Sequence, residues 1–329
     1  MYDNIQNFNK ILESFNIKAQ CVNYVNNSNY SFYDIKLDPK TKVSSLEKYN
    51  NEISLALKAN NRSTIKILYD RGIVRFEFCS DNSKKLQLFE LFNNKRAKGA
   101  VSCLLGETTD KSQVWMDLAQ NPHMIVSGTT GSGKSTLLHN IIANIFHYNE
   151  CSLYLIDPKS VEFQIYESYD GVTFDTSFRG SISILDQLLS LMEYRYSIIK
   201  SSISLNHIPY TILIIDEFSD LIIQDKGNEF YSKLCLLSQK CRAARISIIL
   251  STQRPSANII NGTIKANFPA RIACKVASHV DSKVVIDAVG AEKLNGFGDA
   301  LLRDNTRYLE RFQIAYTTPE EVNERFNKY

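Results

Sequence analysis

One run of eight residues restricts the fold of this chain more than any other feature. It reads Gly128-Thr129-Thr130-Gly131-Ser132-Gly133-Lys134-Ser135, and it lies between an apolar run at 124–127 and a helical pattern of Leu and Ile at 137–145. Glycines let successive backbone N–H groups wrap a phosphate chain, and the N-terminus of the following helix adds partial positive charge. This loop works only between a strand and a helix. The sequence therefore predicts an α/β fold with a nucleotide site.

The residues of this loop have separate expected roles. Lys134 places a point charge on the β- and γ-phosphates, and Ser135 offers its hydroxyl to Mg²⁺. We expect nucleotide contacts along the whole segment, at Gly128, Thr129, Thr130, Gly131, Ser132, Gly133, Lys134, Ser135 and Thr136.

A second apolar strand supplies the carboxylates that nucleotide hydrolysis needs. The run Ile212–Ile215 leads directly into Asp216-Glu217, about 80 residues beyond the phosphate loop. Asp216 is expected to hold Mg²⁺, directly or through water, and Glu217 to polarise the attacking water. The pair favours ATP hydrolysis over a kinase or a GTPase switch, with ATP and Mg²⁺ as cofactors.

Three further features are less specific. Gln253 follows the strand predicted at 246–250, where it is either a polar group near the phosphates or part of a simple turn before Pro255. Arg242 ends a helical pattern beside Lys240, and spacing alone favours a solvated basic face over an arginine finger for a neighbouring subunit. The run 157–159, Asp-Pro-Lys, taken alone indicates a turn.

The pattern of predicted elements divides the chain into a small α/β domain, residues 1–95, and a larger domain, residues 96–329. A polar, basic segment at 93–99 marks the boundary. The large domain alternates strands and helices, which favours a mainly parallel sheet. Its strands are expected at 124–127, 151–156, 211–215, 246–250 and 271–276, and a capping box at Thr318–Glu321 predicts a final helix. In the small domain we expect a helix at 8–15, a strand at 31–37, a helix opened by a Ser44–Glu47 capping box, and a hairpin at 63–69 and 73–78.

Composition narrows the class of protein further. Residues 1–98 hold 16 Lys and Arg against 10 Asp and Glu, a net charge of +6, whereas the rest of the chain has a net charge of −3. The basic part could meet a polyanion, although an ordinary Lys-rich surface is an equal alternative. Seven scattered cysteines without a C-x-x-C spacing indicate reduced thiols in the cytoplasm. No apolar run reaches the ~18 residues of a membrane span, and no secretory signal is evident.

Taken together, the motifs resemble those of the FtsK/SpoIIIE family of DNA-translocating ATPases. The matching runs are PHMIVSGTTGSGKS, LIDPKSVEF, ILIIDEFSDLI, LSQKCRAARI, STQRPSANIINGTIKANFPARIA and GAEKLNGFGDALL, in order over about residues 100–302. The resemblance implies a RecA-like motor that forms a hexameric ring around double-stranded DNA, with ATP between subunits. It implies that Arg242 is the arginine finger and that Gln253 senses the γ-phosphate. Residues 1–95 resemble the small α domain of that family.

The chain also departs from the family pattern. It shows no membrane region, long linker or winged-helix domain. We therefore expect that the protein acts for a plasmid, conjugative element or phage rather than in a septum-anchored role. Arg245 replaces the usual Gly after the arginine-finger segment. Two alternatives remain: a protein-export ATPase of the type VII secretion class, and a P-loop protein that binds ATP only to fix an oligomer. The intact Asp216-Glu217 pair counts against the second.

Overall fold

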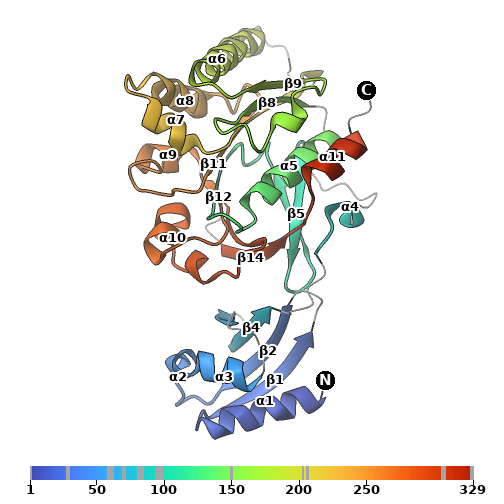
Figure 1. Cartoon of the computed structure of the whole chain (residues 1–329), viewed down its shortest axis with the longest axis vertical. Coiled ribbons are helices and arrows are strands. Elements are labelled where there is room, and N and C mark those ends of the chain that lie inside the picture. Colours follow the sequence, from blue (N-terminus) through green and yellow to red (C-terminus); the bar gives the residue numbers. More distant parts are fainter. Residues whose placement is uncertain are drawn as a thin grey trace. The chain divides into compact units, whose positions relative to one another are not determined.

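The chain folds into two units, each with a β-sheet and a hydrophobic core of its own. The computed structural model describes residues 2–26, 30–57, 63–68, 72–79, 85–92, 99–148, 151–201, 204, 207–304 and 309–326. The units are Met1–Leu86 and Gln87–Tyr329 (Figure 1). Apart from Gly99, the predicted linker at 93–99 lies outside the described residues.

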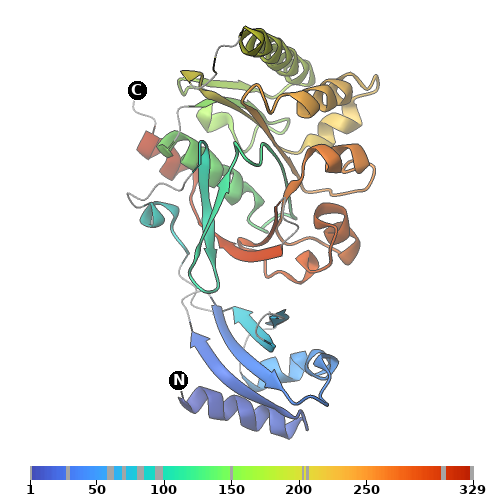
Figure 2. The same ribbon diagram turned by 180° about the vertical axis from the view of Figure 1, so that it is seen from behind.

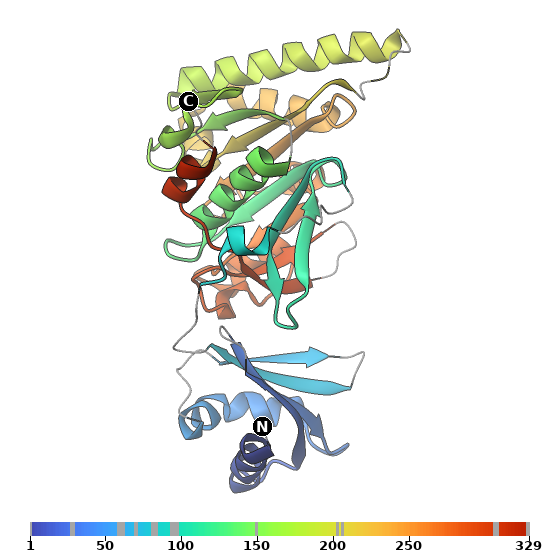
Figure 3. The same ribbon diagram turned by 90° about the vertical axis from the view of Figure 1, so that its right-hand side faces the viewer.

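The small unit is a four-stranded antiparallel sheet with helices (Figure 3). Its elements are α1 (Tyr2–Ser14), β1 (Ala19–Asn26), β2 (Tyr30–Leu37), α2 (Val43–Lys48), α3 (Asn50–Ala56), β3 (Ser63–Leu68) and β4 (Ile73–Cys79). The strands lie in the order β1-β2-β4-β3. Phe8 of α1 stacks on Tyr33 of β2 with ring centroids 4.1 Å apart, and both rings are buried. This contact joins the first helix to the sheet.

The predicted capping box in the small unit is wrong. The helix begins at Val43, one residue before Ser44, and its N-cap is Lys42, whose side chain makes no capping hydrogen bond. Ser44 therefore lies inside the first turn, where its hydroxyl cannot serve the helix start. The helix also ends at Lys48, because Tyr49 leaves helical geometry before α3 begins at Asn50. Strand β1 was not predicted at all.

The large unit is built on a ten-stranded sheet. In chain order its elements are α4 (Leu88–Leu91), β5 (Ser102–Thr108), β6 (Gln113–Asp117), β7 (His123–Ser127), α5 (Lys134–Tyr148), β8 (Cys151–Ile156), η1 (Gln164–Tyr166), β9 (Val172–Asp175), α6 (Phe178–Lys200), β10 (Tyr210–Ile215), α7 (Phe218–Gln224), α8 (Glu229–Lys240), β11 (Ile246–Thr252), α9 (Gly262–Asn267), β12 (Ala270–Ala273), α10 (His279–Ile286), η3 (Ala291–Lys293), β13 (Asp299–Arg303), β14 (Leu309–Ile314) and α11 (Pro319–Phe326).

The sheet has a parallel part and an antiparallel part. Its order is β6-β5-β14-β13-β12-β7-β11-β10-β8-β9. The strands from β12 to β9 pair in parallel, whereas β13, β14, β5 and β6 extend the sheet by antiparallel pairing. The predicted parallel sheet is confirmed for all five expected strands. Strands β5, β6, β9, β13 and β14 were not predicted.

Burial on both faces explains why the central strands were recognisable. All five residues of β7 and all seven of β11 are buried, so these strands are continuously apolar or nearly so, as sheets covered by helices require. In Figures 1 and 2, α5 and α11 lie on one face of the sheet, and α7 to α10 lie on the other. The predicted capping box of α11 is confirmed: Glu321 N donates to Thr318 Oγ1 at 3.2 Å, and Thr318 N donates to the Glu321 carboxylate at 3.0 Å.

Two further expectations concern thiols and membranes. Cys21, Cys103, Cys235, Cys241 and Cys274 have free thiols. Burial raises the pKa of Cys274, next to the phosphate loop, to about 12. Among the described helices, none combines the length and apolar character that crossing a bilayer requires.

Candidate nucleotide site

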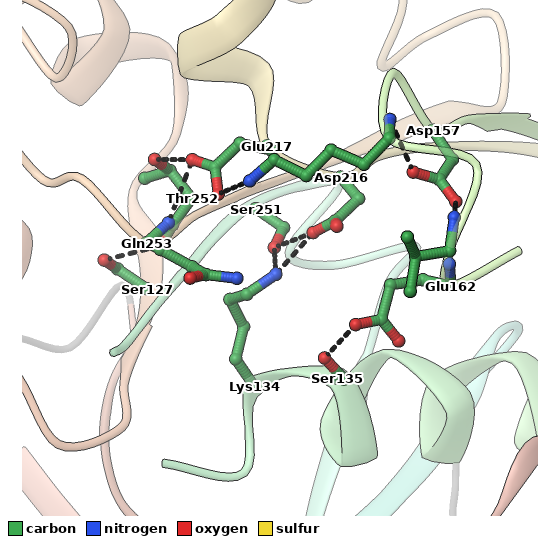
Figure 4. Close-up of polar contacts among 12 residues, drawn as sticks. Ser127, Lys134, Ser135, Asp157, Glu162, Asp216, Glu217, Ser251, Thr252 and Gln253 are labelled. Carbon is green, nitrogen blue, oxygen red and sulfur yellow. Dashed lines mark hydrogen bonds and ion pairs between the residues drawn. The ribbon is translucent and has the colours of Figure 1, made fainter. Parts of the chain in front are cut away.

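The candidate site lies where the parallel strands end. The loop 128–133 follows β7, Asp157 follows β8, Asp216 follows β10, and Gln253 follows β11. In register, Ile215 of β10 is the partner of both Ile156 of β8 and Leu250 of β11. Because parallel strands end at the same edge, their loops meet there. The sheet thus brings the predicted phosphate loop, metal ligand, water-polarising carboxylate and Gln253 together (Figure 4).

The phosphate loop is fixed on its outer side by backbone contacts. Phe297 N donates to Gly131 O at 3.1 Å, and Gly298 N donates to Ser132 O at 2.9 Å. Gly133 has φ +104°, and a Cβ there would lie 2.5 Å from Gly298 N. Only glycine satisfies both demands. The segment before β13 therefore packs backbone to backbone against the loop.

Lys134 and Asp216 form a buried ion pair under the loop. The Lys134 ammonium donates to Asp216 Oδ1 and, at 2.9 Å, to Ser251 Oγ. Ser251 Oγ in turn donates to the same Asp216 oxygen at 2.8 Å. Both charged side chains are 3% exposed. If a phosphate group binds the Lys134 ammonium, the Asp216 carboxylate becomes available to bind a cation.

Glu217 is held by hydrogen bonds on both of its carboxylate oxygens. Its Oε1 accepts from Ser219 Oγ at 2.5 Å, Thr252 Oγ1 at 2.8 Å and Gln253 N at 3.1 Å. Its Oε2 lies 3.0 Å from Lys159 Nζ. Burial raises the pKa of Glu217, but the hydrogen bonds that it accepts outweigh burial, and the net shift is downward. The residue is an ionised, oriented carboxylate, and its backbone has a left-handed φ of +41°.

Gln253 connects the phosphate loop with Glu217. Its Oε1 accepts from Thr130 Oγ1 at 3.0 Å, while its backbone N donates to Glu217. One residue thus touches the loop that surrounds the phosphates and the carboxylate that would polarise water. The sensing role of Gln253 stays a prediction.

The Asp-Pro-Lys run, which sequence alone indicated as a turn, contributes to the site. Asp157 is fully buried, and its Oδ2 accepts from the backbone N of Val161, Glu162 and Phe163 at 2.8, 2.8 and 3.1 Å. Lys159 reaches across to Glu217. The available signal was position: the run follows a strand of the predicted parallel sheet, so it could have been expected at the same edge as Asp216.

Arg242, in contrast, lies at the opposite edge of the sheet. It comes four residues before β11 begins, and its Nη2 is 3.5 Å from the carbonyl oxygen of Gln120, which precedes β7. The seven residues of β11 place about 20 Å between this edge and Gln253. Arg242 is exposed, and within the described part of the chain it has no hydrogen bond or ion pair with the site of its own subunit.

Arg245, the departure from the family pattern, has a backbone φ of +56°. Glycine reaches this conformation at no cost, which accounts for the family's usual residue. The Arg245 guanidinium lies 4.9 Å from the centre of the Tyr210 ring, and Nη1 donates to Ile208 O at 2.9 Å. The added charge is thus packed against its own chain.

The oxygen ligands at this edge fit Mg²⁺. The Ser135 hydroxyl, the Asp216 carboxylate and the nearby Glu162 carboxylate are hard donors of the kind this cation prefers (Figure 4). Among the described residues, no three or more His, Cys, Asp or Glu side chains are grouped so that they alone could hold a metal ion.

This fold and site define a RecA-like P-loop protein, and comparisons with known proteins identify the family. The model of the FtsK/SpoIIIE family matches residues 86–208. The DNA translocase FtsK of Treponema pallidum is 30% identical over 334 residues, and that of Chlamydia trachomatis is 31% identical over 346. The DNA translocase SftA of Bacillus subtilis is 30% identical over 317 residues. The chain belongs to the FtsK/SpoIIIE family.

Coverage differs between these relatives and the solved structures. The FtsK matches include 94 and 95% of this chain but 42 and 43% of the relatives, so the chain spans less than half of their length. The conjugation coupling protein TcpA of pCW3, solved with ATPγS, has a TM-score of 0.67 at 18% identity, covering 98% of this chain and 99% of that one. The cytoplasmic domain of the type VII secretion ATPase EccC of Thermomonospora curvata has a TM-score of 0.63 at 21% identity, covering 74 and 34%. These structures confirm the RecA-like fold.

Proposed function

We propose that this protein is an ATP-driven translocase of double-stranded DNA that acts in the cytoplasm, on a plasmid or another conjugative element. The proposal of ATP hydrolysis rests on the edge of the sheet at which the parallel strands end, the carboxyl edge. There the phosphate loop, Asp216, Glu217 and Gln253 form one connected network. DNA as substrate rests on the relatives named DNA translocases, which match nearly the whole chain. A conjugative role is supported by TcpA, whose match covers nearly all of both chains.

In this proposal Lys134 binds the β- and γ-phosphates, and residues 128–136 surround them. Ser135 and Asp216 would hold Mg²⁺, which would neutralise phosphate charge. Glu217 orients the attacking water through Oε2, which must first exchange Lys159 for that water. Oε1 keeps its three donors, so the carboxylate does not need to reorient during this exchange.

The observation that carries the subunit arrangement is the position of Arg242. An exposed arginine about 20 Å from the site of its own chain can stabilise transition-state charge only on the nucleotide of another copy. We therefore propose a ring, hexameric as the family resemblance implies, with ATP between subunits and duplex DNA in the channel.

A DNA-stimulated ATPase assay tests the function. We expect hydrolysis to rise strongly with double-stranded DNA of any sequence and to lose that stimulation steeply with salt, since contacts with phosphates release counterions. Glu217→Gln serves as the inactive control, and displacement of a triplex-forming strand reports movement along the duplex. ATPase activity indifferent to DNA would favour the type VII secretion alternative, which the EccC fold shares. Nucleotide binding without hydrolysis would favour the oligomer-fixing alternative.

A further inference from the structure

A chain of four polar side chains begins at the first turn of α5. Ser135 Oγ donates to Glu162 Oε1 at 2.5 Å, and His139 Nε2 lies 3.2 Å from Glu162 Oε2. His139 Nδ1 is 2.9 Å from Tyr166 Oη. Ser135 and His139 are four residues apart and so share one face of the helix. Glu162 closes against that face from the loop after β8.

The loop places Glu162 with little freedom. The buried Asp157 carboxylate accepts from three consecutive backbone N–H groups, including that of Glu162 itself. The Glu162 carboxylate is thus fixed beside the hydroxyl that we assign to the metal.

A hydroxyl that binds a cation gives an oxygen lone pair to the metal, so its proton must point to another acceptor. Asp216 is the obvious candidate in sequence, but its Oδ1 already accepts from Lys134 and Ser251. The Ser135 hydroxyl donates its hydrogen bond to Glu162 instead. This bond leaves the lone pairs of the Ser135 oxygen available.

We propose that Glu162 is a positioning residue for Mg²⁺: it accepts the hydrogen bond of the Ser135 hydroxyl and so orients the hydroxyl oxygen toward the cation. The inference rests on the proposed function, because the cation in question accompanies ATP. The alternative is a purely structural link between α5 and the loop after β8, which would not depend on metal.

The test measures binding rather than turnover. ADP affinity is determined by calorimetry with excess Mg²⁺ and again with EDTA, for wild type, Ser135→Ala, Glu162→Gln and the double variant. Partners that orient metal ligands are worth about 10–100-fold in metal affinity. We expect Glu162→Gln to lose most of the gain in ADP affinity that Mg²⁺ brings, about tenfold, while its affinity in EDTA stays within about twofold of wild type.

The double variant separates orientation from simple charge. Since Glu162 acts through Ser135, the double variant should bind Mg·ADP no worse than Ser135→Ala alone, whereas independent sites would give additive losses. Tyr166→Phe is the matched control: it removes the far hydrogen bond of the same chain and keeps the Ser135–Glu162 contact. It should leave the Mg²⁺ dependence unchanged. Glu162→Ala repeats the measurement should the Gln variant not fold.

Two results would overturn the role of Glu162 without overturning the proposed function. One is a Glu162→Gln effect equal in Mg²⁺ and EDTA, or absent in both, while wild type binds ADP with a clear gain from Mg²⁺. The other is additivity in the double variant. Wild-type protein that binds neither ATP nor ADP would instead overturn the proposed function, so the two failures are distinct.

Discussion

At the carboxyl edge of the large sheet, Lys134, Asp216 and Glu217 are each no more than 3% exposed, and each is held by other side chains. At the opposite, amino edge, where the parallel strands begin, Arg242 is exposed, and its side chain lies 3.5 Å from the backbone carbonyl of Gln120. The first region is an internal network of ion pairs and hydrogen bonds. The second is an exposed charge about 20 Å away, at the other end of the parallel strands. In the proposed function the first region binds the nucleotide, and Arg242 acts on the nucleotide of another chain.

The largest effect should come from the amino edge. Arginine fingers contribute about 10³–10⁵ in rate, so Arg242→Ala should reduce hydrolysis by at least about a thousandfold. Its ATP affinity should stay near wild type, because none of its own phosphate or metal contacts change. Steady-state ATPase and equilibrium nucleotide binding measure the two properties separately.

Mixing subunits sharpens the same comparison. Lys134→Ala should lose most nucleotide affinity but keep Arg242, and Arg242→Ala keeps the phosphate loop. Neither alone should hydrolyse ATP, whereas mixed rings contain interfaces with both intact halves and should regain part of the activity. Wild-type hydrolysis by oligomeric Arg242→Ala would instead make Arg242 an ordinary surface charge.

The next effect belongs to the carboxyl edge. Positioned general bases are worth about 10²–10⁴ in rate, and Glu217→Gln should lose an amount in that range while still binding ATP. The amide keeps an oxygen that can accept the Ser219 and Thr252 hydrogen bonds. Single-turnover hydrolysis measures the chemical step. Turnover at the wild-type rate would show that another group polarises the water.

A smaller effect is expected from the ion pair between Lys159 and Glu217. Lys159 is about half exposed, so its ion pair with Glu217 is weak. Lys159→Met should free Oε2 and raise hydrolysis without DNA a few-fold, with less further stimulation by DNA. The matched control is Lys233→Met, since Lys233 pairs with Asp186 and Glu229 away from the site. A drop in basal activity for Lys159→Met would mean that Lys159 assists the reaction rather than restraining it.

The smallest effect concerns the turn beside Arg242. A left-handed backbone costs non-glycine residues about 1–2 kcal/mol, so Arg245→Gly relieves strain while it loses the Tyr210 and Ile208 contacts. The two terms nearly cancel, and the free energy of unfolding should change by less than about 1 kcal/mol. Arg245→Ala loses the contacts and keeps the strain, so it should be the less stable variant in urea unfolding. ATPase activity should not change in either.

A feature of the fold or the site could be predicted from the sequence when a short segment of the chain determines it. The phosphate loop, Asp216 and Glu217 were identifiable because each follows a strand whose burial on both faces makes it continuously apolar. Strands β13 and β14 lack such runs, and their antiparallel pairing depends on contacts that no short segment encodes. Lys159 and Glu162 were missed because their contacts, with Glu217 after β10 and with Ser135 of α5, appear only when the fold is assembled. The prediction of a capping box at Ser44 was wrong because the presence of suitable residues does not by itself determine where a helix starts.

The backbone contact between Gly133 and Gly298 has a mechanical consequence. Two hydrogen bonds and a side-chain-free contact fasten the phosphate loop to the residues that lead into β13. Strand β13 is paired with β14, and β14 with β5. Any displacement of the loop would therefore pass directly to the antiparallel half of the sheet. Gly298→Ala would strain the backbone of this segment, where φ is +90°, and would place a Cβ 2.6 Å from Gln313 Nε2. We expect this variant to weaken the coupling between ATP hydrolysis and the proposed movement of DNA more than it weakens ATP binding.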